Sequence, residues 1–89
     1  MNSRTTRRFR QLFAALPAHV KRKAREAYRL FRQNPAHASL HFKQVHTDPP
    51  VYSARVGISY RAVGILDGGT VVWYWIGSHA KYDRLLAQF

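Results

Sequence analysis

The side chains of this sequence that could do chemistry are mainly basic residues and histidines. Fifteen of the 89 residues are Lys or Arg, five are His, only four are Asp or Glu, and none is Cys. This composition lacks the paired carboxylates and cysteine clusters that many enzymes use. Lys, Arg, His and Tyr can still cleave a phosphodiester without a metal. They can supply a base for the ribose 2′-hydroxyl, cations for the charge on phosphorus and an acid for the leaving oxygen.

The five histidines do not follow a metal-binding pattern. They are His19, His37, His41, His46 and His79. His41 and His46 do not have the i, i+4 spacing that would put two ligands on one helix face, and the acids are too scattered to complete a coordination shell. A glycine-rich phosphate loop is also absent from the sequence. We therefore expect neither a metal nor a cofactor.

The charge of the chain indicates its kind of partner. The formal net charge is +11 at pH 7, and eleven of the fifteen cations are Arg. The planar guanidinium matches phosphate oxygens better than the ammonium of Lys does. Because so large a charge repels itself in a compact state, we expect a polyanion or an acidic protein as partner, with nucleic acid favoured. A basic surface kept only for solubility is the alternative.

A membrane is not an expected partner. No apolar run approaches the roughly 18–20 residues of a spanning helix, and the basic segments are also patterned for a core. The basic start, MNSRTTRRFRQLF, leads into no apolar signal-peptide core. The absence of cysteine fits a reducing compartment, so we expect a cytoplasmic protein.

Two helices are predicted in the first part of the chain, after residues 1–5, which we expect to be frayed. Thr6 is suited to cap a first helix whose apolar residues follow a spacing of three and four. These apolar residues are Phe9, Leu12, Phe13 and Leu16. Pro17 ends this helix, and a second helix covers residues 18–33, with cations outside its apolar face. The two helices are expected to form an antiparallel hairpin.

The period of the apolar pattern then changes from 3.6 to 2. We expect strands at residues 40–45, 51–56, 60–66 and 70–76. Asp67-Gly68-Gly69 indicates a hairpin turn, because glycine tolerates a positive φ. The last strand contains VVWYWI, which is apolar on both faces and therefore belongs at the centre of the sheet. Trp73 and Trp75 would share one face as a buried pair or, in the alternative, as an exposed pair that stacks on bases.

A short amphipathic helix completes the chain, with Ser78 as its cap. Its apolar residues are Tyr82, Leu85, Leu86 and Phe89. The chain is long enough for a single domain, residues 1–89. The predicted fold class is α+β. We expect an N-terminal helical hairpin packed on a three- to four-stranded antiparallel sheet, with a short C-terminal helix.

Segments from nearly the whole chain resemble the RelE/ParE superfamily. They are RRFRQLFAALPAHVKRKAREAYRLFRQNP, LHFKQV, VYSARVGISYRAVGIL and VVWYWIGSHAKYDRLL. The most telling features are ARVG followed shortly by YRAV, and an apolar strand that closes in IGSH. The resemblance implies a RelE/ParE-like fold and the toxin component of a bacterial type II toxin–antitoxin system, with a cognate antitoxin as partner.

The resemblance also implies four catalytic residues. Arg55, in ARVG, matches the strand arginine with which RelE-like nucleases hold the scissile phosphate. Lys43 lies on the strand where these nucleases carry catalytic or phosphate-binding cations. His79 follows Gly77-Ser78, where the family places a catalytic Arg or His, and a histidine exchanges protons near neutral pH. Tyr82 lies near the C-terminus, where a tyrosine often serves.

Each of these roles has a plainer alternative. Arg55 and Lys43 can be solvated cations on exposed strand positions. His79 can be a polar residue at the start of a helix. Tyr82 also fits the apolar stripe of the last helix, which would make it a core residue.

Six further residues are predicted to bind phosphate or RNA. They are Arg61, His41, His46, Lys21, Arg22 and Arg25. Arg61, in YRAV, matches the superfamily pattern and either binds phosphate or braces the sheet. His41 and His46 flank Lys43 and are second-rank acid–base candidates. The helical cations would contact ribosomal RNA or a partner protein as point charges.

Two features depart from the superfamily pattern. Relatives usually begin with a short strand before the first helix, and MNSRTTRR leaves little room for one, so we expect that strand to be missing or rudimentary. Relatives that end in GSHA usually place an acid after the Ala, where this chain has Lys81. If that acid positions the histidine, its replacement by Lys81 would impair activity.

Three functions are compatible with these residues. The favoured one is a metal-independent, ribosome-dependent mRNA endoribonuclease that inhibits translation, with the ribosome and mRNA as partners. The second is a ParE-like poison of DNA gyrase that does not cut RNA. The third is a nucleic-acid-binding module without catalytic activity. A single scaffold can host all three, so the site residues must decide between them.

Overall fold

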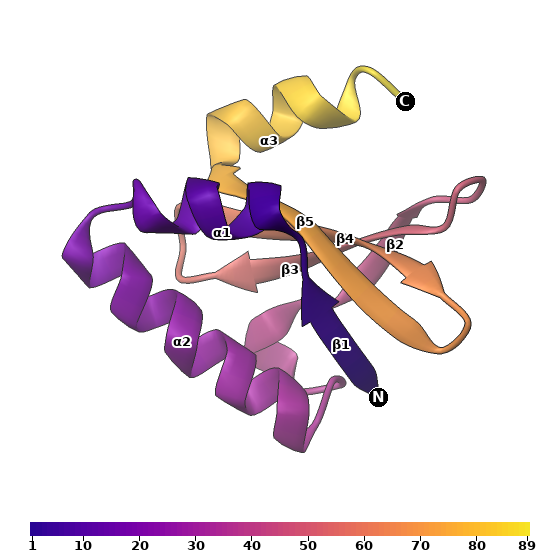
Figure 1. The fold of residues 1–89 in the computed structure, drawn as a ribbon, viewed down its shortest axis with the longest axis horizontal. Helices are drawn as coiled ribbons and strands as arrows, with labels where there is room; N and C mark the ends of the chain where they lie inside the picture. Colours follow the sequence, from indigo (N-terminus) through magenta and orange to yellow (C-terminus); the bar gives the residue numbers. More distant parts are fainter.

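A five-stranded mixed sheet in the order β1-β5-β4-β3-β2 forms the centre of the fold (Figure 1). The computed structural model describes residues 1–89. In chain order the elements are β1 Asn2–Thr5, α1 Arg7–Ala14, α2 Ala18–Gln33, the 3₁₀ turn η1 Ala38–Leu40, β2 Lys43–His46, β3 Val51–Val56, β4 Tyr60–Asp67, β5 Thr70–Ser78 and α3 His79–Leu86. The predicted α+β fold class is confirmed, with one more strand than expected.

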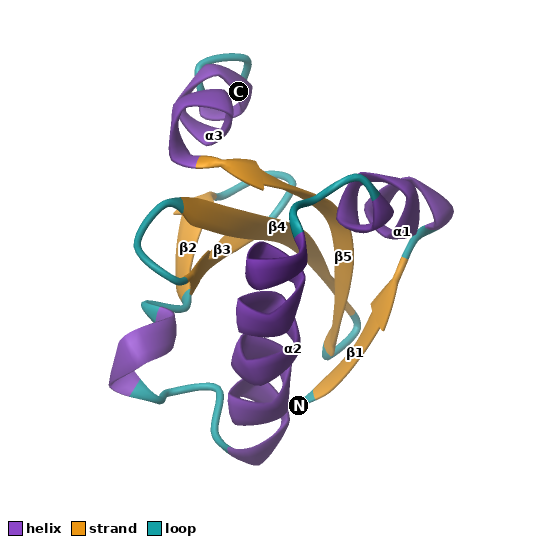
Figure 2. Cartoon of the chain, turned by 90° about the vertical axis from the view of Figure 1, so that its left-hand side faces the viewer, coloured by secondary structure: helices purple, strands orange, loops and turns teal.

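The helices begin where the local signals predict, and α1 ends at Ala14, three residues before Pro17. The Thr6 hydroxyl caps α1 by accepting a hydrogen bond from the Phe9 amide at 3.1 Å. Pro17 precedes α2, which covers the predicted residues 18–33. From their junction at Pro17 the two helices diverge: α1 lies against β5, while α2 lies against β3 and η1 (Figures 1 and 2). The hairpin is therefore open, and an apolar groove separates its two helices.

The start of the chain is not frayed. Residues 2–5 form β1, which pairs in parallel with β5 from Asn2 opposite Thr70 to Thr5 opposite Trp73. The Thr6 amide extends this ladder with a bond to the Trp73 carbonyl at 3.0 Å. The expectation of frayed residues was wrong, and the strand expected to be missing or rudimentary is present with four residues. Its pairing uses backbone groups and leaves no periodic signal in Asn-Ser-Arg-Thr.

The strand expected at residues 40–45 is shifted toward the C-terminus. Leu40 ends η1 and is only 2% exposed, because it turns inward to the core. His41 follows with a left-handed φ of 44°, and pairing begins only at Lys43. The other three strands contain the predicted ranges, and the last one continues to Ser78.

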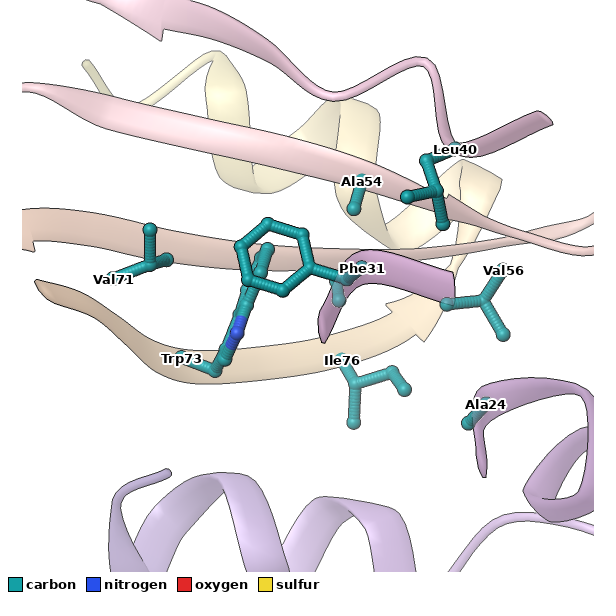
Figure 3. Packing of buried hydrophobic residues seen from close by; sticks show 9 residues of the cluster. Ala24, Phe31, Leu40, Ala54, Val56, Val71, Trp73 and Ile76 are labelled. Carbon is teal, nitrogen blue, oxygen red and sulfur yellow. The ribbon is translucent and has the colours of Figure 1, made fainter. Parts of the chain in front are cut away.

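Two cores lie on opposite faces of the sheet. The α2 face carries the larger core, which consists of Ala24, Phe31, Leu40, Ala54, Val56, Ala62, Val71, Trp73 and Ile76 (Figure 3). Phe31 meets the edge of Trp73 with ring centroids 5.4 Å apart. The α3 face carries a smaller core, which consists of Val51, Val63, Trp75 and Tyr82. The sheet is thus covered by helices on both sides.

A β-bulge separates the two tryptophans. Val63 pairs with Trp75 and Gly64 with Trp73, so β5 has one extra residue, Tyr74, at this point. Trp73 therefore packs in the core of the α2 face and Trp75 in the core of the α3 face. Both are buried, as predicted for a core pair, at 4% and 9% exposure. The expectation that they share one face was wrong, because a bulge inverts the alternation.

Gly64 leaves the space that the bulge needs. A Cβ at this position would lie 2.8 Å from Val71 Cγ1 and 3.0 Å from Trp73 Cε3. Because both neighbours are buried, we expect Gly64→Ala to lower the free energy of unfolding by about 1–3 kcal/mol. Thermal unfolding followed by circular dichroism should then show a lower Tm, by about 4–8 °C per kcal/mol. An unchanged Tm would contradict this packing.

Candidate active site

A row of basic side chains crosses one end of the α3 face. Arg55 on β3 lies directly opposite Arg61 on β4, and Arg61 lies opposite Gly77 on β5. His41 precedes β2, and its Nε2 lies 3.4 Å from Arg55 Nη1. His79 begins α3 directly after β5. We call His41, Arg55, Arg61 and His79 the basic row. Because neighbouring strands are about 4.8 Å apart, the row spans about 14 Å over four strands.

The two arginines are held by backbone carbonyls. Arg55 Nε donates to the Gly57 carbonyl at 3.2 Å. Arg61 Nη1 donates to the carbonyls of Ile58 at 3.2 Å and Tyr60 at 2.8 Å. A guanidinium has five N–H donors, so each arginine keeps donors for an incoming anion. Both side chains are half-buried, which limits the water that competes for those donors.

Lys43 belongs to the same face, one step along the strands. It lies opposite Ser53 on β3, two residues before Arg55. Diagonal neighbours of this kind have Cα atoms about 7–8 Å apart. The Lys43 side chain is exposed and makes no hydrogen bond, so its ammonium can reach an anion bound at the row.

No carboxylate neutralises the arginines. The chain has one ion pair, between His79 Nε2 and Asp83 Oδ2 at 3.4 Å. Asp83 therefore supplies an acid beside the histidine, one helical turn after His79 and two residues after Lys81. With Nε2 facing the carboxylate, Nδ1 is the ring nitrogen left for another partner. The sequence interpretation missed Asp83, although its i, i+4 spacing from His79 was a usable signal.

Two predicted site residues lie outside the basic row. His46 is at the far end of β2, where Nδ1 lies 3.2 Å from the Pro49 carbonyl and the ring lies 5.0 Å from that of Phe89. It pairs with Val51, about 13 Å along β3 from Arg55. Tyr82 is 6% exposed and fills the core of the α3 face, as the core alternative expects. Burial raises the pKa of another phenol on this face, that of Tyr74, which stays protonated near neutral pH.

The helical cations lie across the sheet from the row. Lys21, Arg22 and Arg25 are on α2, and the Arg25 guanidinium lies 5.3 Å from the centre of the Phe13 ring. Arg29 and Arg32 extend the same exposed helix surface. RNA binding by these residues stays a prediction. It would involve a surface separate from the basic row.

The structure contains no group of three or more His, Cys, Asp or Glu side chains that could hold a metal ion. None of the helices has both the length and the apolar character needed to cross a membrane.

Comparison with known proteins assigns the chain to a family. The family model of the ParE-like toxin domain matches residues 18–84, from the start of α2 to the second turn of α3. The chain belongs to the ParE-like toxin domain family. This match includes every residue of the basic row. The sequence finds no match among curated proteins.

Solved structures share the fold of this ParE-like domain. The RelB–RelE antitoxin–toxin complex from Methanococcus jannaschii contains a chain that is 17% identical, with a TM-score of 0.70, over 90% of this chain and 95% of that one. The toxin–antitoxin complex RelBE2 from Mycobacterium tuberculosis contains a chain that is 23% identical, with a TM-score of 0.67. The match covers 88% of this chain and 96% of that one. YafQ from Escherichia coli strain BL21(DE3) is 14% identical, with a TM-score of 0.68, over 91% of this chain and 96% of YafQ. The predicted RelE/ParE-like fold is thereby confirmed.

The contact between His79 and Asp83 makes a prediction about the histidine ring. We expect Asp83→Asn to change the tautomer of neutral His79, because the carboxylate favours a proton on the facing Nε2. The ¹⁵N chemical shifts of the ring report this change directly in NMR spectra. Asp67→Asn, at the end of β4, is the matched control. Identical His79 shifts in both variants and the wild type would contradict the coupling.

Proposed function

We propose that this ParE-like domain is the toxin of a type II toxin–antitoxin system and cleaves mRNA on the ribosome without a metal. The observation that carries this proposal is the basic row, in which arginines free of carboxylates stand between two histidines. The positive charge of the row complements the negative charge that develops when a phosphodiester becomes a pentacovalent phosphorane. The fold shared with RelE and YafQ chains is consistent with it but does not by itself decide the activity.

The proposed reaction is an in-line attack of the ribose 2′-oxygen on the adjacent phosphorus. His79 accepts the 2′-hydroxyl proton through Nδ1, while Asp83 holds Nε2. Arg55 and Arg61 stabilise the phosphorane with their remaining donors. The bond from phosphorus to the 5′-oxygen then breaks, and this oxygen takes its proton from His41 or Lys43. The products are a 2′,3′-cyclic phosphate and a free 5′-hydroxyl.

Removing one arginine of the row should abolish most of the cleavage. We expect Arg55→Ala to reduce the cleavage rate by about 10²–10³-fold, the usual loss for one donor to the developing charge. The assay is primer extension on a defined mRNA in a purified translation system. The control is Arg84→Ala, which removes an exposed cation of α3 outside the row. Full cleavage by Arg55→Ala would contradict the assignment.

The alternative target is DNA gyrase, which the ParE-like family match keeps in view. Under this alternative the message stays intact in the translation assay. Gyrase–DNA cleavage complexes would then persist, and supercoiling would be inhibited. A chain that affects neither message nor gyrase would be a binding module only.

The proposed protein partner is a cognate antitoxin, and the groove between α1 and α2 suits a segment of it. A cavity of about 570 Å³ lies between these helices and the α2 face of the sheet. Its lining is mostly apolar and includes Phe9, Phe13, Ala27, Phe31 and Trp73. Three arginines, Arg4, Arg10 and Arg25, also contribute to it. An amphipathic segment with apolar anchors and acidic flanks complements both properties.

A carboxylate placed in this groove should weaken the complex. We expect Ala27→Glu to reduce the affinity for the antitoxin encoded beside the gene by at least tenfold, because the charge would be desolvated among apolar groups. Isothermal titration calorimetry measures the affinity. Ala18→Glu, on the exposed start of the same helix, is the matched control. Equal affinities for the two variants would show that the antitoxin binds to a different surface.

A further inference from the structure

The turn between β3 and β4 contacts three parts of the basic row through three successive carbonyls. The Gly57 carbonyl accepts from Arg55 Nε at 3.2 Å, and the Ile58 carbonyl accepts from Arg61 Nη1 at 3.2 Å. The Ser59 carbonyl accepts from the His79 amide at 2.8 Å. Figure 1 shows this turn beside the end of β5, where α3 begins. One short loop thus touches three different elements of the site.

We propose that this turn, residues 57–59, is the positioning element of the basic row. It sets the head groups of Arg55 and Arg61 and the first residue of α3 in one fixed arrangement before substrate arrives. This inference rests on the proposed function, because the row is taken as the site of phosphodiester cleavage. The turn itself acts only through the residues that it holds.

The strands alone would not hold these head groups. Sheet pairing fixes the Cα atoms of Arg55 and Arg61 opposite each other, but a long side chain can still adopt many rotamers. Like charges directly opposite on a sheet also repel, which would drive the two guanidinium groups apart. The carbonyl dipoles offset this repulsion. Unlike a carboxylate, they do not neutralise the positive charge. The arginines therefore stay oriented and cationic, which is what preorganised stabilisation of a phosphorane requires.

Backbone geometry, and not a packed side chain, shapes the turn. Gly57 has a φ of +60°, in the left-handed region that glycine adopts readily. Ile58 at the tip is 76% exposed, so burial of its side chain does not anchor the loop. A Cβ on Gly57 would lie 2.9 Å from Lys23 Cδ, which shows that α2 lies against the back of the turn. Gly57 is thus the residue on which the direction of the three carbonyls depends.

The decisive comparison is between two glycine substitutions with similar backbone strain. Gly68, in the distant turn between β4 and β5, has a φ of +56° and open space around its Cβ position. We expect Gly57→Ala and Gly68→Ala to lower the Tm by similar amounts. Only Gly57→Ala should lower the rate of mRNA cleavage, by at least tenfold at saturating ribosomes. Wild-type cleavage by Gly57→Ala would overturn the proposal.

Two further measurements keep the inference testable if Gly57→Ala folds poorly. In wild-type protein we expect a protected His79 amide in hydrogen exchange and a slowly exchanging Arg55 Nε–H signal in NMR spectra. Gly68→Ala, in the distant turn between β4 and β5, should leave both signals and cleavage unchanged. Fast exchange of both groups in wild-type protein would overturn the proposal.

The failure of the proposed function can be told apart from the failure of this inference. If the wild-type chain does not cleave mRNA, the nuclease assignment fails. The exchange measurements, together with an NMR titration with inorganic phosphate, still test the turn. Arg55 and Arg61 signals that shift together in wild type, and separately or not at all in Gly57→Ala, would support positioning. Equal responses in both proteins would overturn it.

Discussion

The bulge at Tyr74 in the β4–β5 ladder is the constraint on which the rest of the structure depends. Because one extra residue lies opposite Val63, Trp73 faces α2 and Trp75 faces α3. Each tryptophan then anchors a separate core. A regular ladder would put both rings on one face, so that Trp75 could not pack in the core beneath α3. The position of His79 at the start of α3 follows from this arrangement, so the bulge indirectly builds the candidate site.

The second physical feature is that backbone carbonyls, and not carboxylates, bind the cationic side chains of the row. The chain has a net charge of +11 and no ion pair that involves Lys or Arg. The arginines of the row are oriented by carbonyls of one turn and of Tyr60, which leaves their charge available to a phosphate. Self-repulsion lowers the stability of such a domain, and an anionic partner relieves it. The same argument accounts for an expected antitoxin and for an expected RNA substrate on different surfaces.

The two surfaces lie on opposite sides of the sheet. The basic row is on the α3 face, whereas the apolar groove and the arginines of α2 are on the other. A partner segment in the groove would not touch the row directly. It could still block access to a large target such as a ribosome, because the domain extends only 33 × 30 × 25 Å. Solved structures with 14–23% identity share the fold.

The sequence by itself determined the features that local signals encode. Thr6 and Pro17 bound the helices, the apolar periods separate helix from strand, and Gly68 and Gly69 mark the hairpin turn. Arg55, Arg61 and His79 were predicted as site residues from resemblance, and His41 from its place near Lys43. The structure places them in one row, and their roles stay predictions. Only the tertiary structure decided which side chains meet. The strand β1 pairs through its backbone, the bulge inverts the tryptophans, and the carbonyls of residues 57–59 reach the row through space. These features depend on contacts between distant segments or on backbone geometry, and neither leaves a period or a motif in the chain.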